Sequence, residues 1–264
     1  MSTLTDYLQV SNNLAKWQKV TQASTSVKQQ TQYFQDNIGK VTSASQLINN
    51  PRLFNYALTA YGLGDQTKNK ALFQKILQQG SATRATLAYQ LNNPNILAFA
   101  QAFDFAGKGS TVTQATGFAS NIVSKYTEQQ LETNQGQTNP GVQLALYFQR
   151  NAPNITSILG ILADKNILTV VQTALGISPL TAAEPIDQQV SQLTGKVNLA
   201  DFKDPKKLQS FISRFAALYD YNNGGASGSA SASSNVLLYD ASTGGANGLD
   251  TNTLLALQNV RTGY

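Results

Sequence analysis

An all-α fold is predicted by three features of this 264-residue sequence. Apolar residues recur at intervals of three and four, which places them on one face of a helix. Asn-Pro and Asp-Pro pairs precede several apolar runs, and each pair suits a helix start because Asn or Asp caps the helix and Pro fits its first position. Val and Ile are thinly spread and alternation with a period of two never lasts, so strands are not supported.

Two helices are expected to open the chain. The first has apolar residues at helical spacing, at Leu4, Leu8, Leu14 and Trp17. After a break rich in Thr and Ser, a second apolar stripe follows at Val27, Phe34, Ile38 and Val41.

Four further helix starts indicate an internal duplication. They are Asn50-Pro51 and Asn93-Pro94 in the first half, and Asp164-Lys165 and Asp204-Pro205 in the second. The first helix of each half ends at a glycine, Gly62 or Gly176, where a C-cap is expected because glycine takes the left-handed conformation without strain. The matched spacing predicts a helical pseudo-repeat that relates residues 50–105 with residues 164–219.

A long helical hairpin, residues 111–150, is expected to join the two repeats. Its first helix runs from Thr111 to about Glu132 and carries an apolar stripe. The polar segment 134–140 then turns the chain into a second helix, which contains Val142 and Phe148.

The end of the chain is predicted to separate from this helical body, residues 1–221. Residues 222–248 are expected to be a flexible linker, because the Gly, Ser and Ala of 222–234 cannot bury enough apolar area to offset their ordering entropy. A short C-terminal helical segment follows at 249–264, with an apolar stripe of Leu254, Leu257 and Val260. Such a short helix is marginal alone, so this stripe either closes over the chain's own core or contacts a partner protein.

Composition excludes many kinds of site. The chain has no cysteine and no histidine, which excludes disulfides, zinc sites built from these residues and His-dependent catalytic triads. Only 12% of residues are charged, while Gln and Asn together fill about 50 positions, so the surface is expected to be polar and largely neutral. The net charge of +5 comes from scattered residues apart from a small cluster at Lys203, Lys206 and Lys207, so no nucleic-acid partner is expected.

Hydropathy argues against membrane insertion, since no segment approaches the ~18 consecutive apolar residues that a spanning helix needs. Residues 1–15 lack a continuous apolar core and the first lysine is Lys16, so we expect no cleaved signal peptide. The expected location is the cytoplasm, and export would have to use a route without such a signal.

Each remaining candidate for catalysis has a simpler explanation. Glu128 and Glu132 lie four apart on one helix, where a solvated face is expected. Asp201 and Asp204 flank a helix start and suit capping. Ser124 and Lys125 are adjacent on a helix, so their side chains point about 100° apart and not at each other.

Two loop motifs are also incomplete. The segment Gly107-Lys108-Gly109-Ser110 lacks the first glycine of a phosphate loop, and the segment from Asp220 lacks the twelfth-position Glu of a calcium loop. No catalytic, metal-binding or cofactor-binding residue is therefore predicted.

The aromatic residues are expected to form the core. They fall at helical spacing, and a few of them could line a groove for a partner helix: Tyr56, Tyr61, Phe99, Phe103, Phe105, Phe148, Phe215 and Tyr219.

Several segments resemble the alphaproteobacterial domain-of-unknown-function family numbered 1217. The opening of the family is resembled by Val27–Ile38, Asn50–Phe54 and Ala60–Leu63, and two later signatures by Ala102–Phe105 and Gln143–Arg150. Together the segments cover roughly residues 25–221 in the family's order and spacing. This chain departs from charge-rich members by placing Gln or Asn where acids or bases are common.

The resemblance implies a role in building or operating the bacterial flagellum, since members are commonly encoded within flagellar gene clusters. It carries over no catalytic residue. The sequence also resembles axial flagellar proteins, which leave through the flagellar export channel, in its lack of cysteine and its neutral polar composition.

The expected function is therefore a non-enzymatic structural or assembly role through contacts with other proteins. Candidate contact residues are Leu254, Leu257 and Val260. Three alternatives stay open: a helical scaffold unrelated to the flagellum, an RNA-associated helical repeat, which the missing basic stripe disfavours, and an enzyme that uses a carboxylate pair. The last would show two acids in one concave pocket with a perturbed pKa.

Overall fold

The computed structural model describes residues 2–223, and within them the predicted all-α fold is confirmed. All regular elements of this part of the chain are helices, and no strand occurs in it. The predicted C-terminal segment, with Leu254, Leu257 and Val260, lies outside the described residues, as does the predicted linker from residue 224 onward. None of the helices between residues 2 and 223 combines the length and apolarity needed to cross a bilayer.

The described chain divides into two compact units. Residues 8–143 form one, here called the N-unit, and residues 2–7 together with 144–223 form the other, here called the C-unit. The boundaries fall within helices α1 (Thr3–Ser11) and α11 (Pro140–Asn151). The helical body predicted for residues 1–221 thus contains two compact units.

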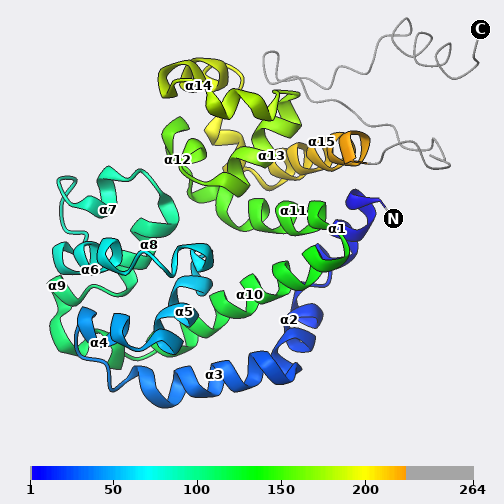
Figure 1. Ribbon diagram of the computed structural model, residues 1–264. Helices are drawn as coiled ribbons and strands as arrows, with labels where there is room; N and C mark the ends of the chain where they lie inside the picture. Colours follow the sequence, from blue (N-terminus) through cyan, green and yellow to red (C-terminus); the bar gives the residue numbers. More distant parts are fainter. Residues whose placement is uncertain (1, 224–264) are drawn as a thin grey trace, which may run out of the picture. The chain divides into compact units, whose positions relative to one another are not determined.

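The N-unit is arranged around its longest helix, α10 (Phe118–Thr138). This helix packs against α5, α2 and α3, and Figure 1 shows it running beside them. In chain order the other elements are α2 (Leu14–Ala23), α3 (Thr25–Ile38), α4 (Ala44–Asn49), α5 (Pro51–Ala60), η1 (Gly64–Gln66), α6 (Lys70–Gln79), α7 (Leu87–Gln90), α8 (Pro94–Ala102), α9 (Phe105–Lys108) and η2 (Gly109–Gln114).

Aromatic rings fill the core of the N-unit. The Tyr56 ring stacks between those of Phe34 and Tyr126, with centroids 4.4 and 3.8 Å away. Phe99 meets the rings of Phe73 and Phe103 at 5.5 and 4.9 Å. These contacts confirm the core role predicted for Tyr56, Phe99 and Phe103.

The start of the chain contains three helices where the sequence predicted two. The first predicted helix breaks at Asn12 and Asn13, so that α1 ends at Ser11 and α2 begins at Leu14. Asparagine competes for backbone hydrogen bonds and disfavours helix interiors, and the Asn13 side-chain amide donates to the Gln9 carbonyl. The apolar period alone could not show this break.

The predicted helix from Thr111 begins later and ends later than expected. Residues 109–114 form the 3₁₀ helix η2, and α10 begins only after Gly117, whose φ of +81° is left-handed. At the other end α10 continues to Thr138, so most of the predicted turn 134–140 is helical. The chain leaves the helix at Asn139, which is extended because the following Pro140 disfavours helical backbone there.

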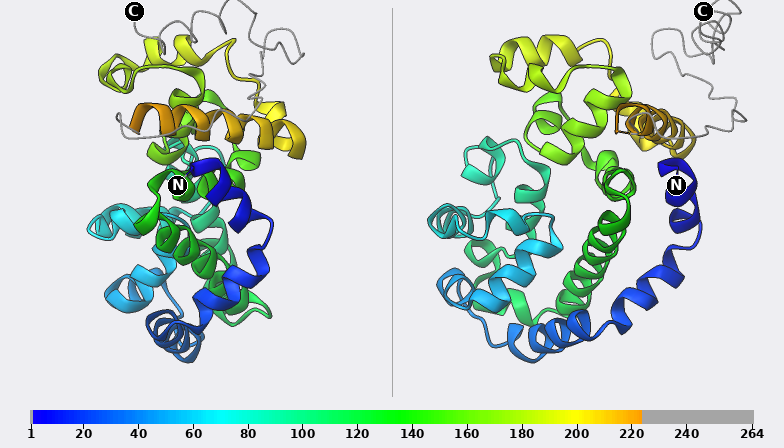
Figure 2. Two further views of the ribbon diagram at one scale, coloured as in Figure 1. Left: turned by 90° about the vertical axis from the view of Figure 1, so that its right-hand side faces the viewer. Right: turned by 45° about the vertical axis from the view of Figure 1, so that its right-hand side comes forward.

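The C-unit is built around α13 (Lys165–Leu175) and α15 (Pro205–Asn223). These two helices pack against each other, and both can be followed in Figure 2. The rings of Phe148, Phe202 and Phe211 meet pairwise at 5.1 to 5.4 Å. The remaining elements are η3 (Ala152–Asn154), α12 (Ile158–Leu162), η4 (Pro179–Ala183), α14 (Ile186–Leu193) and η5 (Leu199–Lys203).

Helix α15 also corrects the predicted start of the linker. The linker was expected to begin at residue 222, but α15 includes both Asn222 and Asn223. The Asn223 amide donates to the Tyr219 carbonyl and so continues the hydrogen bonding of the last turn. The same helix holds residues 2–7 in this unit, because the Asp220 carboxylate accepts hydrogen bonds from Ser2 and Thr3.

All four predicted helix starts are confirmed by their caps. The side chains of Asn50, Asn93, Asp164 and Asp204 each accept hydrogen bonds from backbone N–H groups two or three residues later. In each half the first helix ends in the same way, with Gly62 at φ +71° and Gly176 at φ +66°. The duplication itself stays a prediction, since α8 has 9 residues and α15 has 19.

Candidate functional site

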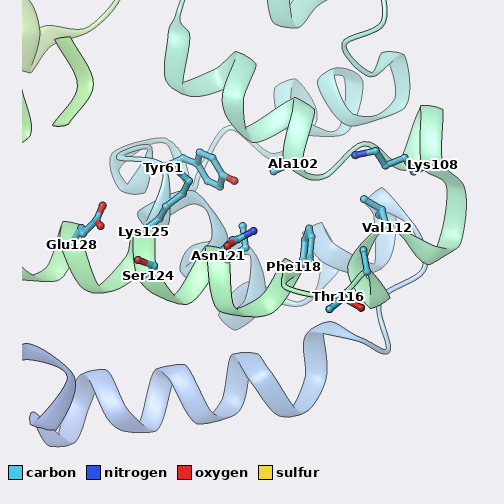
Figure 3. Close-up of a pocket in the computed structure, with 12 residues that line it drawn as sticks. Tyr61, Ala102, Lys108, Val112, Thr116, Phe118, Asn121, Ser124, Lys125 and Glu128 are labelled. Atoms are coloured by element: carbon cyan, nitrogen blue, oxygen red, sulfur yellow. The ribbon is translucent and has the colours of Figure 1, made fainter. Parts of the chain in front are cut away.

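A cavity of about 490 Å³ lies within the N-unit. Helix α10 forms one wall, and the other wall is formed by the ends of α5 and α8 and by residues 108–116. Figure 3 shows its labelled side chains on these two walls. We call it the N-unit cavity, and its lining residues are Tyr61, Ala102, Lys108, Val112, Ala115, Thr116, Phe118, Asn121, Ile122, Ser124, Lys125 and Glu128. Its volume falls in the range of small-molecule sites, about 300 to 1,000 Å³.

Helix α10 forms one wall of the cavity, because its lining residues recur at intervals of three and four and so lie on one face of the helix. Phe118, Ile122 and Lys125 are spaced by four and three residues and therefore lie on one face. Glu128 extends this face by one more turn and accepts a hydrogen bond from the Gln18 side chain. The late start of α10, set by Gly117, places Phe118 in its first turn at the cavity.

The other wall is positioned by two helix ends. Tyr61 is the C-cap residue of α5, immediately before Gly62 turns the chain with a positive φ. Lys108 ends the short helix α9, which Asp104 caps by accepting from the Gly107 N–H. A Cβ on Gly107 would collide with the Asp104 carboxylate, so a larger residue here would displace that carboxylate from its capping position.

The polar character of the cavity comes from Tyr61, two lysines and Glu128. Tyr61 is only 7% exposed, and burial raises the pKa of its hydroxyl above the ordinary value. The Lys125 ammonium lies 5.4 Å from the centroid of the Tyr61 ring. Within residues 2–223, no carboxylate forms a salt bridge with Lys108 or Lys125.

Three candidates that the sequence treated separately come together here. Lys108 of the rejected phosphate loop, the pair Ser124 and Lys125, and Glu128 all line the N-unit cavity. No hydrogen bond joins Ser124 to Lys125 in the part of the chain that is described. This convergence could not be predicted from the sequence, because Tyr61 is far from α10 along the chain and the turn that brings Lys108 back to α10 depends on the fold.

The carboxylate pair Glu128 and Glu132 does not lie on a solvated face as predicted. A solvated face was predicted for Glu128 and Glu132, but Glu132 is only 3% exposed and does not line the cavity. The prediction was wrong for Glu132 because spacing along a helix does not reveal which face the rest of the fold covers. Glu128 is the one acidic residue that lines the cavity. The described residues contain no group of three or more acids that could hold a metal ion.

Asp204 fits the capping role expected for it, whereas Asp201 lies inside η5, whose N-cap is Asn198. Hydrogen bonds from the Lys207 and Lys206 backbone N–H groups hold the pKa of Asp204 below its usual value. Asp201 pairs with the Lys207 ammonium at 2.7 Å.

A second feature, which the sequence did not indicate, is an exposed apolar surface on the C-unit. Leu180 in η4 is 83% exposed, and Ile186 at the start of α14 is 62% exposed. Leu159 on α12, the helix that packs against α14, is also exposed. We call these three residues the α12–α14 surface. Pro179 and Pro185 precede two of them and signalled only a break in helix structure.

Comparison with known proteins gives one structural relative. The chain is similar to a protein from Agrobacterium tumefaciens with an X-ray crystal structure from a structural genomics consortium, at 32% sequence identity and a TM-score of 0.76. The similarity covers 84% of this chain and 97% of that one. No curated protein matches.

A family model also matches, over residues 60–208, and this range contains all the residues of the N-unit cavity and the α12–α14 surface. The family is described as a protein of unknown function, DUF1217. The chain belongs to the DUF1217 family.

Proposed function

We propose that this protein is a non-enzymatic structural or assembly component of the bacterial flagellum that acts by contacting other proteins. Membership of the DUF1217 family supports the flagellar part, through the association with flagellar gene clusters that the resemblance implies. The proposed location is the cytoplasm, with export through the flagellar apparatus as the alternative. The predicted contact residues Leu254, Leu257 and Val260 lie outside the described residues and stay a prediction.

The observation that carries protein contact is the α12–α14 surface. Single exposed apolar residues are common, but Leu180 and Ile186, the two most exposed aliphatic side chains among residues 2–223, lie only six positions apart on the consecutive elements η4 and α14. Full burial of a Leu or Ile side chain contributes about 1.5 to 3 kcal/mol, so a partner that covers Leu180 and Ile186 gains stability from them.

Neutral polar residues and two acids, Glu184 and the exposed Asp187, lie beside this surface in the sequence. Ser178 and Gln188 are exposed beside it. A polar rim around an apolar centre is the usual anatomy of a protein interface. The partner surface is therefore expected to be apolar at its centre and polar at its edge.

The double variant Leu180→Ser/Ile186→Ser is expected to abolish or strongly reduce swimming. The measurement complements a strain that lacks the gene with wild-type or variant protein and scores motility and filaments. Because both side chains are exposed, the free energy of unfolding should change by no more than about 0.5 kcal/mol for each. Reduced motility would then follow from lost contacts and not from unfolding.

Val20→Ser is the matched control, since Val20 is also exposed but lies on α2 of the N-unit. This variant should swim like the wild type. Normal swimming with normal filaments in the strain without the gene would refute the flagellar role. A deletion phenotype that the double variant fully rescues would show that the α12–α14 surface is not the contact.

A further inference from the structure

The Tyr61 hydroxyl is an unused hydrogen-bond donor at the N-unit cavity. The residue is nine-tenths buried, its ring meets Phe99 edge-on at 5.7 Å, and its hydroxyl forms no hydrogen bond with any described residue. Figure 3 shows the hydroxyl directed into the cavity. A tyrosine hydroxyl is protonated at neutral pH, and burial raises the pKa of this one further, so it can donate to an acceptor.

Two cations face the same space. Lys125 lies by the Tyr61 ring on one wall, and Lys108 lies towards the other end of the cavity in Figure 3. Glu128 supplies the only negative charge among the lining residues, which leaves a net charge of +1. A ligand with a single negative charge would balance it.

The start of α10 adds to the positive potential. Its N-cap is Gly117, which offers no side-chain acceptor, and the first turn contains no acidic residue. Thr116 and Phe118, on either side of this glycine, both line the cavity. The Phe118 N–H donates to the Ala115 carbonyl, and the positive end of the helix dipole favours a nearby anion.

The apolar residues of the lining suit the hydrocarbon part of an organic ligand. Val112 and Ile122 are buried apolar residues at the cavity wall, and Phe118 lies beside them. A volume of about 490 Å³ is far larger than an inorganic anion needs. Apolar contacts together with a few convergent polar groups are typical of a small-molecule site.

We propose that the N-unit cavity binds an organic monocarboxylate. Its carboxylate accepts a hydrogen bond from the Tyr61 hydroxyl and pairs with the Lys125 ammonium, while its apolar part lies against Val112, Phe118 and Ile122. Such a carboxylate can come from a free acid or from the C-terminus of a polypeptide. This binding goes beyond the proposed function and does not depend on it.

The test titrates the purified full-length protein with three probes by NMR or calorimetry. The probes are 3-phenylpropanoate as the free acid, N-acetyl-leucyl-leucine as a peptide C-terminus, and 3-phenylpropanamide as the neutral control. At least one acid should bind, more weakly as salt increases, and the amide should bind at least tenfold more weakly. The acid that binds more tightly identifies the source of the carboxylate.

Two variants locate the site. Tyr61→Phe removes only the hydroxyl and keeps the ring contacts, and Lys125→Gln removes the charge, so each should weaken binding about tenfold. Lys28→Gln, at an exposed position on α3 outside the lining, should leave the affinity unchanged. Matched melting temperatures would show that the variants are folded. The proposal is overturned if neither acid binds, if the amide binds equally well, or if both cavity variants bind the acid like the wild type.

Discussion

Replacing Phe99 by alanine is expected to lower the free energy of unfolding of the N-unit by about 4 kcal/mol. Phe99 is fully buried, and its ring contacts those of Tyr61, Phe73 and Phe103. The substitution removes apolar burial and leaves a cavity that three other rings cannot all move to fill. Urea denaturation measures the loss, followed by fluorescence of Trp17, the single tryptophan, which lies on α2 of this unit.

Phe99→Leu is the control for this prediction. It keeps an apolar side chain and most of the volume, so the expected loss is about 1.5 kcal/mol. An alanine variant that lost no more than the leucine variant would contradict the central place of Phe99 in the N-unit core.

Asp164→Ala is expected to lower the free energy of unfolding of the C-unit by about 3 kcal/mol. The carboxylate, in a residue only 6% exposed, caps α13 by accepting from the Asn166 and Ile167 N–H groups at 2.9 and 3.1 Å. It also accepts from the Tyr147 hydroxyl at 2.6 Å. Alanine removes the cap and leaves buried donors without this acceptor. Denaturation followed by far-UV circular dichroism measures the loss, and hydrogen exchange of the first turn of α13 locates it.

Two variants separate burial from capping. Asp164→Asn keeps an oxygen for the two backbone donors and supplies an amide N–H that can donate to the Tyr147 hydroxyl oxygen, so it should lose less stability than alanine. Asp204→Ala removes the equivalent cap of α15 at a fully exposed carboxylate and should also lose less. Equal losses for Asp164→Ala and Asp204→Ala would show that the buried contact with Tyr147 contributes nothing.

Helix starts could be predicted from the sequence because cap chemistry is local. The Asn or Asp oxygen and the N–H groups it accepts from lie within three residues, so no tertiary information is needed at Asn50, Asn93, Asp164 or Asp204. The all-α fold followed from the same caps and from the apolar period.

Glycines in and around α10 show why helix boundaries were harder to predict. Gly117 takes a left-handed φ and precedes the helix, whereas Gly136 lies inside it. A Cβ at position 136 would collide with the Gln143 side chain, so close packing accounts for this glycine. The two residues are alike in the sequence, and only their tertiary surroundings distinguish a break from a close approach.

The N-unit cavity and the α12–α14 surface could not be predicted for a similar reason. The cavity joins Tyr61 to residues of α10 that are distant along the chain, and none of the lining residues is unusual alone. Leu180 and Ile186 are of the same residue types as the apolar core, so the sequence alone does not distinguish them from core residues. Only the fold shows that they are exposed.

Site-specific photocrosslinking in growing cells tests the central claim of protein contact most directly. A photoreactive amino acid at position 180, at the most exposed residue of the α12–α14 surface, should form covalent adducts with an identified flagellar protein. The same amino acid at position 20, on α2, should not form them. Crosslinking at 180 that yields no flagellar protein, in cells where the photoreactive variant supports normal swimming, would contradict the proposed contact.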